Sequence, residues 1–423
     1  MAKQSTLVPM IIIGILFFIF GFVTWLNGSL IPFLKIICEL NEYQALFVTF
    51  AFYIAYTVMA LPMSYVLKRT GYRDGMALGL AIMAVGSLLF IPAAMSANFI
   101  FFLIALFTLG TGLTILQTAS NPYVVCIGPI ESAAMRISIM GIINKGAGVI
   151  VPIAFTALIL SDFDSLEYLT YSDKSDLASR LIVPYLIMAV VLGALIILVK
   201  YSSLPELEFE KDDEVSDKDS IFHYPRVVLG AIALFFYVGI EVIAGDTIGL
   251  YGQGIGVENF TALTSYTMIF MVFGYLVGVF GIPKYLSQER ALIGSALLGI
   301  VFLIGVVSSS SEAHWISEIL WGWSGIATLP NTVTFVALLG FANALVWPTI
   351  WPLALEGLGK HTAQGSALLI MGIAGGAIMP LIFGKIAYTS GDMQSTYIIG
   401  VICYAFILMY AFKWHKIMNW KNI

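Results

Sequence analysis

Long apolar runs separated by short polar connections dominate the sequence. Each run is about 18 residues or longer, and a helix needs roughly 17–25 mainly apolar residues to cross a bilayer. The pattern predicts twelve membrane-spanning helices, at about residues 8–35, 43–67, 75–96, 98–126, 133–160, 181–200, 226–250, 260–283, 290–307, 330–357, 362–388 and 394–414. The expected fold class is an all-α polytopic membrane protein.

The only long polar connection lies between the sixth and seventh runs. It carries eight Asp and Glu residues between Glu206 and Asp219. An acidic segment with so little apolar surface cannot bury enough of it to fold alone. We therefore expect an N-terminal six-helix bundle at 1–201, an acidic cytoplasmic linker at 202–225 and a C-terminal six-helix bundle at 226–423.

Composition excludes several classes of protein. Hydrophobic residues make up 60% of the chain and charged residues only 11%, whereas a soluble domain is about 25% charged. The net charge of −5 argues against nucleic acid as a partner, because phosphate binding needs clustered Lys and Arg. The three cysteines lie far apart, so neither a disulfide framework nor a structural metal is expected. No motif of an enzyme or of a cofactor site is recognisable, and we expect neither.

The distribution of basic residues predicts the orientation. With the N-terminus in the cytoplasm, four of the 20 Lys and Arg residues lie outside (Lys35, Lys174, Arg180 and Lys385) and Lys145 lies within the membrane, which leaves fifteen inside. Cytoplasmic loops of membrane proteins carry such an excess of Lys and Arg. We expect both termini in the cytoplasm, the first run to be an uncleaved span, and a bacterial-type inner membrane as the location.

Short strings recur between the two halves. IMGIINKGAG at 139–148 is similar to IMGIAGGA at 370–377, and LFFIFG at 16–21 is similar to LFFYVG at 234–239. The matches equate span one with span seven and span five with span eleven. This is the pairing expected of two parallel repeats, which generally enclose a binding site near the bilayer midplane.

Three charged residues fall inside predicted spans. Lys145 lies about 16 Å into span five, Glu241 lies about 22 Å into span seven, and Asp246 follows nearer the outside. A charge in the bilayer is retained mainly where it pairs or lines a wet cavity. Lys145 and Glu241 could form a structural ion pair, and Asp246 could reach the water from a helix end. The functional alternative is a site for a proton or another coupling ion.

Uncharged polar residues at comparable depth indicate a binding site. Asn27, Gln117, Asn121 and Asn144 offer amide donors and acceptors, which suit the hydroxyls of a sugar. They could instead be hydrogen-bond contacts between helices. A second group, Asn343, Trp347 and Trp351, recurs every four residues in span ten and is predicted to share one face.

An indole can stack on the apolar face of a sugar ring while amides bind its edge. The two tryptophans could equally be a packing or lipid-facing stripe, because Trp is common in membrane helices.

Several strings resemble the L-fucose:proton symporter family of the major facilitator superfamily, in its glucose/galactose transporter branch. They are FFIFGFVTWLNGSLIPFLK at 17–35, QTASNPYV at 117–124, GPIESAAMRISIMGIINK at 128–145, YVGIEV at 237–242 and WPTIWPLALEGLG at 347–359. The loop at 61–76 is similar to the superfamily's cytoplasmic signature. The resemblance implies two pseudo-symmetric six-helix bundles, a central hexose site and uptake driven by a cation gradient.

The sequence departs from this family at its proton site. In the fucose symporter an Asp follows the span-one Asn and a Glu opens the span-four motif; here these positions hold Gly28 and Gln117. Asn144 matches the family's span-five Asn, but the next residue is Lys145 rather than a small one. The family's proton site therefore cannot be transferred to this chain.

The repeat suggests where the acid lies instead. The register that aligns Leu16 with Leu234 places Gly28 opposite Asp246. Our hypothesis is that Glu241 and Asp246 provide coupling, with Lys145 as an internal counter-charge or a tethered cation. H⁺ would need one carboxylate, whereas Na⁺ would need several oxygen ligands near Asn27, Glu241 and Asp246, including backbone carbonyls close to Gly28 or Gly245.

The expected function is secondary active import of a neutral hexose such as glucose, galactose or fucose, by H⁺ or Na⁺ symport through alternating access. The alternatives are a uniporter, an importer of another polyol or of an acidic sugar that would meet Lys145, and a transporter-like sugar sensor. The expected partners are the sugar and membrane lipid, with the protein monomeric.

Overall fold

The computed structural model describes residues 7–126, 133–160, 170–202, 204, 221–282, 284–358 and 361–420, and every regular element in these ranges is a helix. Helix contacts divide the chain into two compact units, unit 1 at Met1–Glu208 and unit 2 at Phe209–Ile423. The division falls inside the predicted acidic linker. Residues 205–220 of that linker lie outside the described part of the chain, and 221–223 form a single 3₁₀ turn before unit 2 begins its first long helix.

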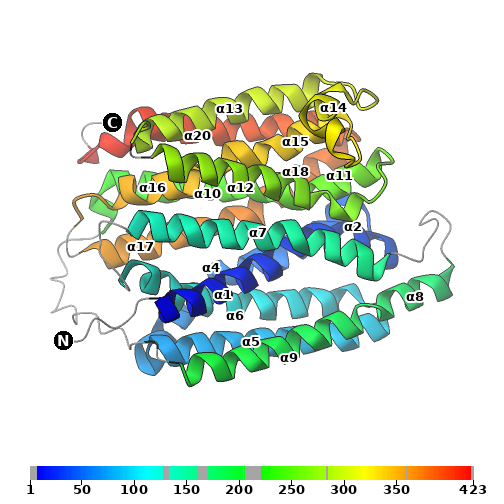
Figure 1. The fold of residues 1–423 in the computed structure, drawn as a ribbon, viewed down its shortest axis with the longest axis horizontal. Helices are drawn as coiled ribbons and strands as arrows, with labels where there is room; N and C mark the ends of the chain where they lie inside the picture. The colour runs from blue at the N-terminus through cyan, green and yellow to red at the C-terminus, as the bar shows by residue number, and fades with distance from the viewer. Residues whose placement is uncertain are drawn as a thin grey trace. The chain divides into compact units, whose positions relative to one another are not determined.

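Unit 1 contains six candidate spans, three of them assembled from two helical segments (Figure 1). In chain order its helices are α1 (Leu7–Trp25) and α2 (Asn27–Ile37), α3 (Glu42–Ala45) and α4 (Phe47–Thr70), α5 (Tyr72–Ser96), α6 (Phe99–Cys126), α7 (Ala133–Ile159), and α8 (Tyr171–Ser179) with α9 (Ile182–Lys200).

Unit 2 contains six further candidate spans. Its longer helices are α10 (Pro225–Asp246) and α11 (Ile248–Gly254), α12 (Thr264–Gly281), α13 (Gln288–Ser308), α14 (Trp315–Trp321), α15 (Asn331–Asn343) and α16 (Val346–Leu355), α17 (Thr362–Met371) and α18 (Gly375–Ser390), and α19 (Met393–Thr396) with α20 (Gly400–Phe412). Its 3₁₀ turns are η2 (Ile221–His223), η3 (Phe260–Ala262), η4 (Gly322–Ser324), η6 (Gly372–Ala374), η7 (Tyr397–Ile399) and η8 (Trp414–Lys416).

The two units repeat one packing scheme. In unit 1 the four most extensive helix pairings join span one to five, two to four, three to four and three to six. In unit 2 they join span seven to eleven, eight to ten, nine to ten and nine to twelve, which is the same set shifted by six spans. The repeat predicted from two short strings therefore extends to the whole helix arrangement within each unit.

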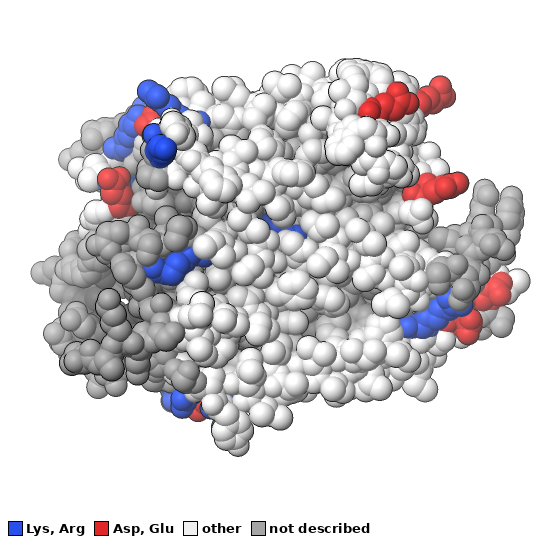
Figure 2. Space-filling view, viewed as in Figure 1, with Lys and Arg blue, Asp and Glu red and all other residues white. Residues whose placement is uncertain are grey.

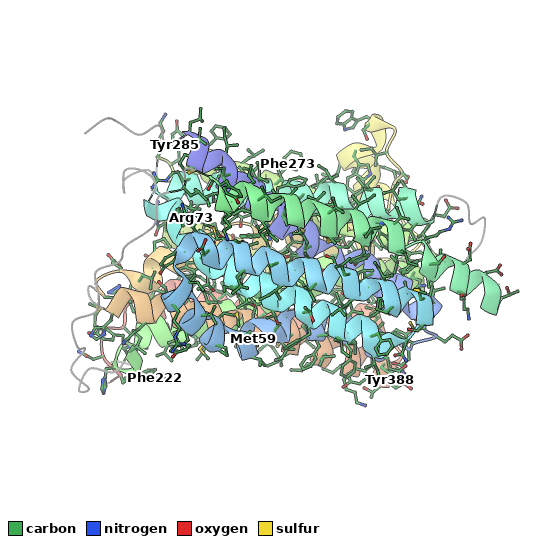
Figure 3. All side chains as sticks on the ribbon, turned by 90° about the horizontal axis from the view of Figure 1, so that it is seen from below. Met59, Arg73, Phe222, Phe273, Tyr285 and Tyr388 are labelled. Carbon is green, nitrogen blue, oxygen red and sulfur yellow. The ribbon has the colours of Figure 1, made fainter. Side chains whose placement is uncertain are left out.

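The outer sides of the helices are apolar. The structure exposes many large hydrophobic side chains, including Phe273 and Val277 of α12. On the face drawn in Figure 2, the charged side chains lie mainly towards the two ends, and the surface between them is almost entirely uncharged. Phe273 faces outwards from its helix in Figure 3. Such surfaces suit a hydrocarbon solvent, and all twelve spans meet the length and composition needed to cross it.

Three spans are interrupted near residues that the sequence marked as candidates. Span one breaks at Leu26, span seven at Thr247, and span ten between Asn343 and Val346. The last break has a local cause, because Pro348 has no N–H to donate to the carbonyl four residues before it. Interrupted membrane helices are tolerated where the freed backbone groups find other partners or line a cavity.

The loop between spans two and three turns at a glycine. α4 ends at Thr70, Gly71 adopts φ +80°, and α5 begins at Tyr72. This left-handed conformation favours glycine because it has no Cβ.

The packing of α1 on α7 depends on another glycine. A Cβ at Gly21 would overlap the backbone carbonyl of Asn144. The equivalent contact in unit 2 is also closely packed, since a Cβ at Gly375 would overlap the Phe235 carbonyl oxygen and a Cβ at Gly239 would lie 2.5 Å from the Met379 side chain. Small residues let membrane helices approach at the backbone.

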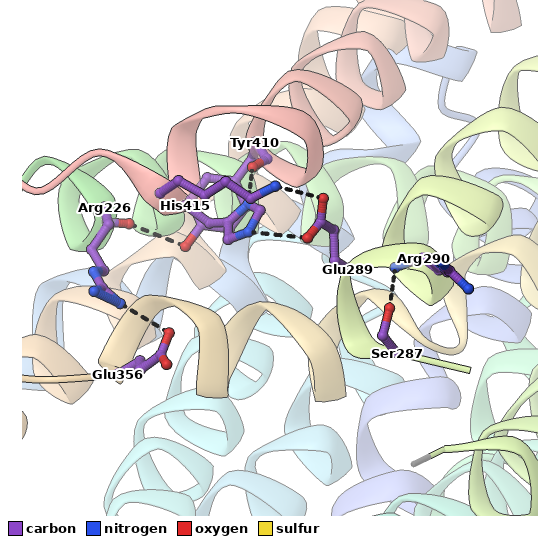
Figure 4. A network of polar contacts seen from close by, with 8 residues as sticks. Arg226, Ser287, Glu289, Arg290, Glu356, Tyr410 and His415 are labelled. Carbon is purple, nitrogen blue, oxygen red and sulfur yellow. Dashed lines mark hydrogen bonds and ion pairs between the residues drawn. The ribbon is translucent and has the colours of Figure 1, made fainter. Parts of the chain in front are cut away.

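Charged side chains connect helix ends in unit 2 (Figure 4). Arg226, at the start of α10, pairs with Glu356 just beyond α16 at 3.2 Å. Glu289, at the start of α13, pairs with Lys416 at 2.7 Å and faces His415 at 3.8 Å. The two contacts of Glu289 attach the segment after α20, which contains His415 and Lys416, to the start of α13.

The α1–α7 contact gives a first prediction. Gly21→Ala should lower thermal stability by several kcal/mol, because the added methyl group cannot fit without separating the two helices. The matched control is Gly193→Ala in α9, where a Cβ meets nothing within 4 Å. Thermal unfolding of both purified variants in detergent measures the difference. Equal stability of the two variants would contradict the close approach.

Candidate functional site

The break in span one places an amide in the interior of unit 1. Asn27 is the first residue of α2 and is fully buried. Within the described structure neither its Oδ1 nor its Nδ2 has a hydrogen-bond partner. A buried amide is normally hydrogen-bonded, so one without partners is a candidate for binding a ligand or water.

A cluster of three residues joins spans one and five. Trp25 Nε1 donates to Asn144 Oδ1 at 3.3 Å, and Asn144 Nδ2 donates to the Phe17 carbonyl at 3.4 Å. The Lys145 ammonium lies 4.2 Å from the centroid of the Trp25 ring. Trp25 and Lys145 are both buried, and removal from water strengthens a cation–π contact. The structure thus brings together Asn144 and Lys145, and adds Trp25, which the sequence analysis did not include.

The span-four amide Gln117 has a hydrogen-bond partner outside this cluster. Gln117 Nε2 donates to the Tyr56 hydroxyl of α4 at 2.9 Å. Gln117 and Asn121 are both half-buried and lie one turn apart on α6, as predicted. Tyr56 is a further residue that the sequence analysis missed, because no local pattern relates it to Gln117.

In unit 2 a buried carboxylate is surrounded by tyrosines. Glu241 of α10 is buried, and it interacts electrostatically with Tyr237, one turn earlier on the same helix. It also interacts electrostatically with Tyr275 of α12 and Tyr404 of α20. The Tyr404 hydroxyl donates to Asn343 Oδ1 at 2.8 Å. Four helices, α10, α12, α15 and α20, therefore contribute polar side chains to one group in an apolar interior.

The second carboxylate lies at the break in span seven. Asp246 is the last residue of α10 and is fully buried. The expectation that it could reach the water from a helix end is therefore wrong, because the residue has no exposed surface. The Thr264 hydroxyl donates to the Gly245 carbonyl at 2.7 Å, and the Thr267 hydroxyl donates to the Ala244 carbonyl at 3.2 Å. One lone pair of the Gly245 carbonyl, a suggested Na⁺ ligand, is thus already used.

The span-ten candidates belong to two helical segments. Asn343 ends α15 and is fully buried, whereas Trp347 and Trp351 lie in α16 and are half-buried. The indole rings are 5.6 Å apart, and Trp347 lies 6.3 Å from the Tyr237 ring. The break separates the predicted stripe into a pair of tryptophans and an asparagine that bonds to Tyr404. Tyr237 lies beside Trp347 and also interacts with Glu241.

The two units hold different chemistry on one scaffold. Unit 1 carries amides, an indole and an ammonium, whereas unit 2 carries two carboxylates, tyrosines and two indoles. Across the described residues no group of three His, Cys, Asp or Glu side chains is placed to hold a metal ion. Hydrogen-bonding groups inside interrupted membrane helices are typical of transporters, which bind solutes near the midplane.

The fold and these groups define a multi-pass membrane transporter rather than an enzyme. The sequence matches the Major Facilitator Superfamily over residues 13–379, and the chain belongs to this family. It is 35% identical over 403 residues to a glucose/galactose transporter of Brucella abortus biovar 1 (strain 9-941), covering 94% of this chain and 92% of that protein. It is 32% identical over 424 residues to a putative glucose/galactose transporter of Helicobacter pylori (strain J99 / ATCC 700824), covering 98% and 99%.

A solved structure has the same fold. The crystal structure of the E. coli fucose:proton symporter aligns with a TM-score of 0.72 at 22% sequence identity, covering 96% of this chain and 98% of that one. The family resemblance and the fold class predicted from the sequence are both confirmed.

The Trp25 cluster gives a second prediction. Trp25→Phe removes the N–H donor but keeps an aromatic face for Lys145, and should cost about 1 kcal/mol of stability. Trp25→Leu also removes the face and should cost about 1–2 kcal/mol more. Thermal unfolding in detergent ranks the variants, with Phe273→Leu on the exposed flank of α12 as the control. If both Trp25 variants were as stable as that control, the cluster would not contribute to the stability of the protein.

Proposed function

We propose that this chain imports a neutral hexose by proton symport through alternating access. Glu241 carries the proposal: it is a buried carboxylate among tyrosine hydroxyls and an amide in a membrane helix bundle. The relatives support both parts of it, since their names specify glucose/galactose transport and fucose-proton symport.

For the sugar, we assign unit 1 the amides Asn27, Gln117, Asn121 and Asn144. An amide can both donate to and accept from a hydroxyl, so a set of them matches a ring that carries several hydroxyls. The unpartnered Asn27 amide supports this assignment most directly. Sugar hydroxyls would supply the hydrogen bonds that it lacks within the described structure.

In unit 2 we assign Asn343, Trp347 and Trp351 to the sugar. The two half-buried indoles offer an apolar surface, and the buried Trp351 Nε1 has no acceptor among the described residues. A sugar hydroxyl or ring oxygen could accept from it. Asn343 touches the sugar only if the Tyr404 contact rearranges, and its main contribution is to the environment of Glu241.

For the coupling ion, we assign Glu241 the proton and Asp246 and Lys145 supporting roles. Glu241 has hydroxyl neighbours that can share a hydrogen bond with either its neutral or its charged form. Asp246 is the residue that the repeat places opposite Gly28, where the fucose symporter family has its acid. Lys145, held over Trp25, is the internal cation of unit 1.

The proposed setting follows from the distribution of charge. We place the protein in a bacterial-type inner membrane as a monomer, with both termini and the linker at 202–225 in the cytoplasm. The excess of Lys and Arg on that side supports this orientation. In this proposal the bundles at 1–201 and 226–423 rock against each other to expose the site to alternate sides.

The coupling assignment is tested in proteoliposomes. With one proton per sugar, a pH difference of one unit supports about tenfold accumulation of labelled hexose, because one pH unit equals 1.36 kcal/mol. Glu241→Gln should reduce accumulation to equilibration while sugar counterflow continues, since counterflow needs no net proton movement. Asp246→Asn should weaken accumulation. Lys145→Ala should alter both the gradient-driven accumulation and the counterflow of the sugar.

The control for this experiment is Glu258→Gln, an exposed carboxylate between α11 and η3. It should leave accumulation and counterflow unchanged. Accumulation that survives both Glu241→Gln and Asp246→Asn would reject the coupling assignment. Accumulation driven by an imposed Na⁺ gradient at equal pH would identify Na⁺, and not H⁺, as the coupling ion.

The sugar site makes a separate prediction. Gln117→Ala and Asn144→Ala should each weaken hexose binding by about 1–3 kcal/mol, or roughly 5- to 150-fold in Kd, because a sugar hydroxyl loses its partner. Equilibrium binding of labelled glucose, galactose and fucose to the detergent-purified protein measures the effect. The control is Gln394→Ala, whose amide donates to backbone carbonyls at the end of α13. Exchange of sugar acids with no response to neutral hexoses would favour an acidic substrate that meets Lys145.

A further inference from the structure

A tryptophan-rich lobe projects between spans nine and ten. We define it as residues 313–329, which contain α14 and η4. Four of its large apolar side chains are strongly exposed: Trp315 at 58%, Ile319 at 70%, Trp323 at 83% and Ile326 at 51%. A soluble surface seldom shows so many large apolar groups together, and such a patch usually marks an interaction site.

The lobe is a folded element and not an open loop. The Ser317 hydroxyl donates to the Leu329 carbonyl at 2.7 Å, and the Leu329 N–H donates back to the same hydroxyl at 3.0 Å. At its base, the Ile316 N–H donates to Asn331 Oδ1 at 3.1 Å, and the Asn331 N–H donates to the Ala313 carbonyl at 2.7 Å. The backbone that presents the exposed side chains is therefore fixed by buried hydrogen bonds.

The lobe adjoins the lipid-facing side of α12. The Trp321 ring packs against Tyr266 and Phe270, with centroid distances of 5.6 and 6.1 Å. One turn further along α12, Phe273 begins the exposed apolar stripe that continues through Val277 (Figure 3). The exposed face of the lobe is thus close to the end of a surface that lies in hydrocarbon.

Its chemistry suits the membrane interface. Residues 309–330 contain three Trp and two Glu but no Lys or Arg. Tryptophan concentrates where headgroups meet acyl chains, because its ring is apolar and its N–H is polar. The absence of basic residues removes any electrostatic attraction to anionic lipids.

We propose that this lobe is an interfacial anchor, which inserts Trp315, Ile319, Trp323 and Ile326 into the boundary between headgroups and acyl chains of the bilayer. The lobe connects two spans that end at the same membrane surface, so its exposed face lies at that surface. By the orientation derived from the sequence, this is the outer leaflet. The anchor fixes the start of α15, the helix that ends at Asn343.

The test measures the depth of one lobe residue in the reconstituted full-length protein. A nitroxide spin label is placed by Ile319→Cys in a background where Cys38, Cys126 and Cys403 are replaced by Ser. Collision with oxygen, which concentrates in the membrane, is compared with collision with a water-soluble nickel complex. The control label is at Glu258→Cys, an exposed site in the connection between α11 and η3.

The anchor predicts severalfold more oxygen and severalfold less nickel access for the label at 319 than for the label at 258. It also predicts the same result in phosphatidylcholine vesicles with and without anionic lipid. Equal water access at both sites would overturn the proposal, and so would low access to both reagents, because the latter means burial in protein. Dipolar broadening between labels on two copies would assign the patch to a dimer instead.

A second variant separates anchoring from folding. Trp323→Ser together with Ile326→Ser should move the label at 319 towards the water while the protein keeps its elution volume and thermal unfolding in detergent, where no bilayer is present. An unchanged depth in this variant would show that these side chains do not hold the lobe in the interface. None of these measurements depends on which solute or ion the protein carries.

Discussion

The low polarity of the bilayer is the constraint on which the rest of this structure depends. Backbone groups cannot remain unpaired in hydrocarbon, so the spans are helices, and their outward side chains are apolar. The same constraint makes each interior polar group informative. Lys145, Glu241 and Asp246 are costly to keep in such a setting, and all three are buried.

The two units show how one scaffold can carry opposite charges. Their principal helix pairings correspond one to one, and closely packed glycines recur at the contact of span one with five and of span seven with eleven. On this common frame, unit 1 has Lys145 where unit 2 has Gly376, and unit 2 has Asp246 where unit 1 has Gly28. The two units thus share a geometry but differ in their chemistry at a few interior positions.

Much of the fold could be predicted from the sequence because it depends on local composition. Apolar run length located all twelve spans, and the two echoed strings identified the repeat. The breaks at Leu26 and Thr247 were not predicted, since neither residue is a helix breaker and the Gly245 carbonyl is held by a threonine from another helix. Most of the tyrosines that surround the candidate site residues were also not predicted. Tyr237 lies one turn from Glu241 and could have been found by helical period, but Tyr56, Tyr275 and Tyr404 come from distant segments.

The contact between Gly21 and Asn144 has a mechanical consequence. At Gly21 the two helices approach so closely that a Cβ would overlap the Asn144 carbonyl, and no side chain separates them at this point. We expect α1 and α7 to move together, because sliding one along the other would break this close contact. Trp25 lies on α1 and Lys145 on α7, so we expect their cation–π contact to persist when the two helices move together. The indole and the ammonium would then keep a fixed position relative to each other. A conformational change of the unit would instead bend the helices at their interruptions, such as the one at Leu26.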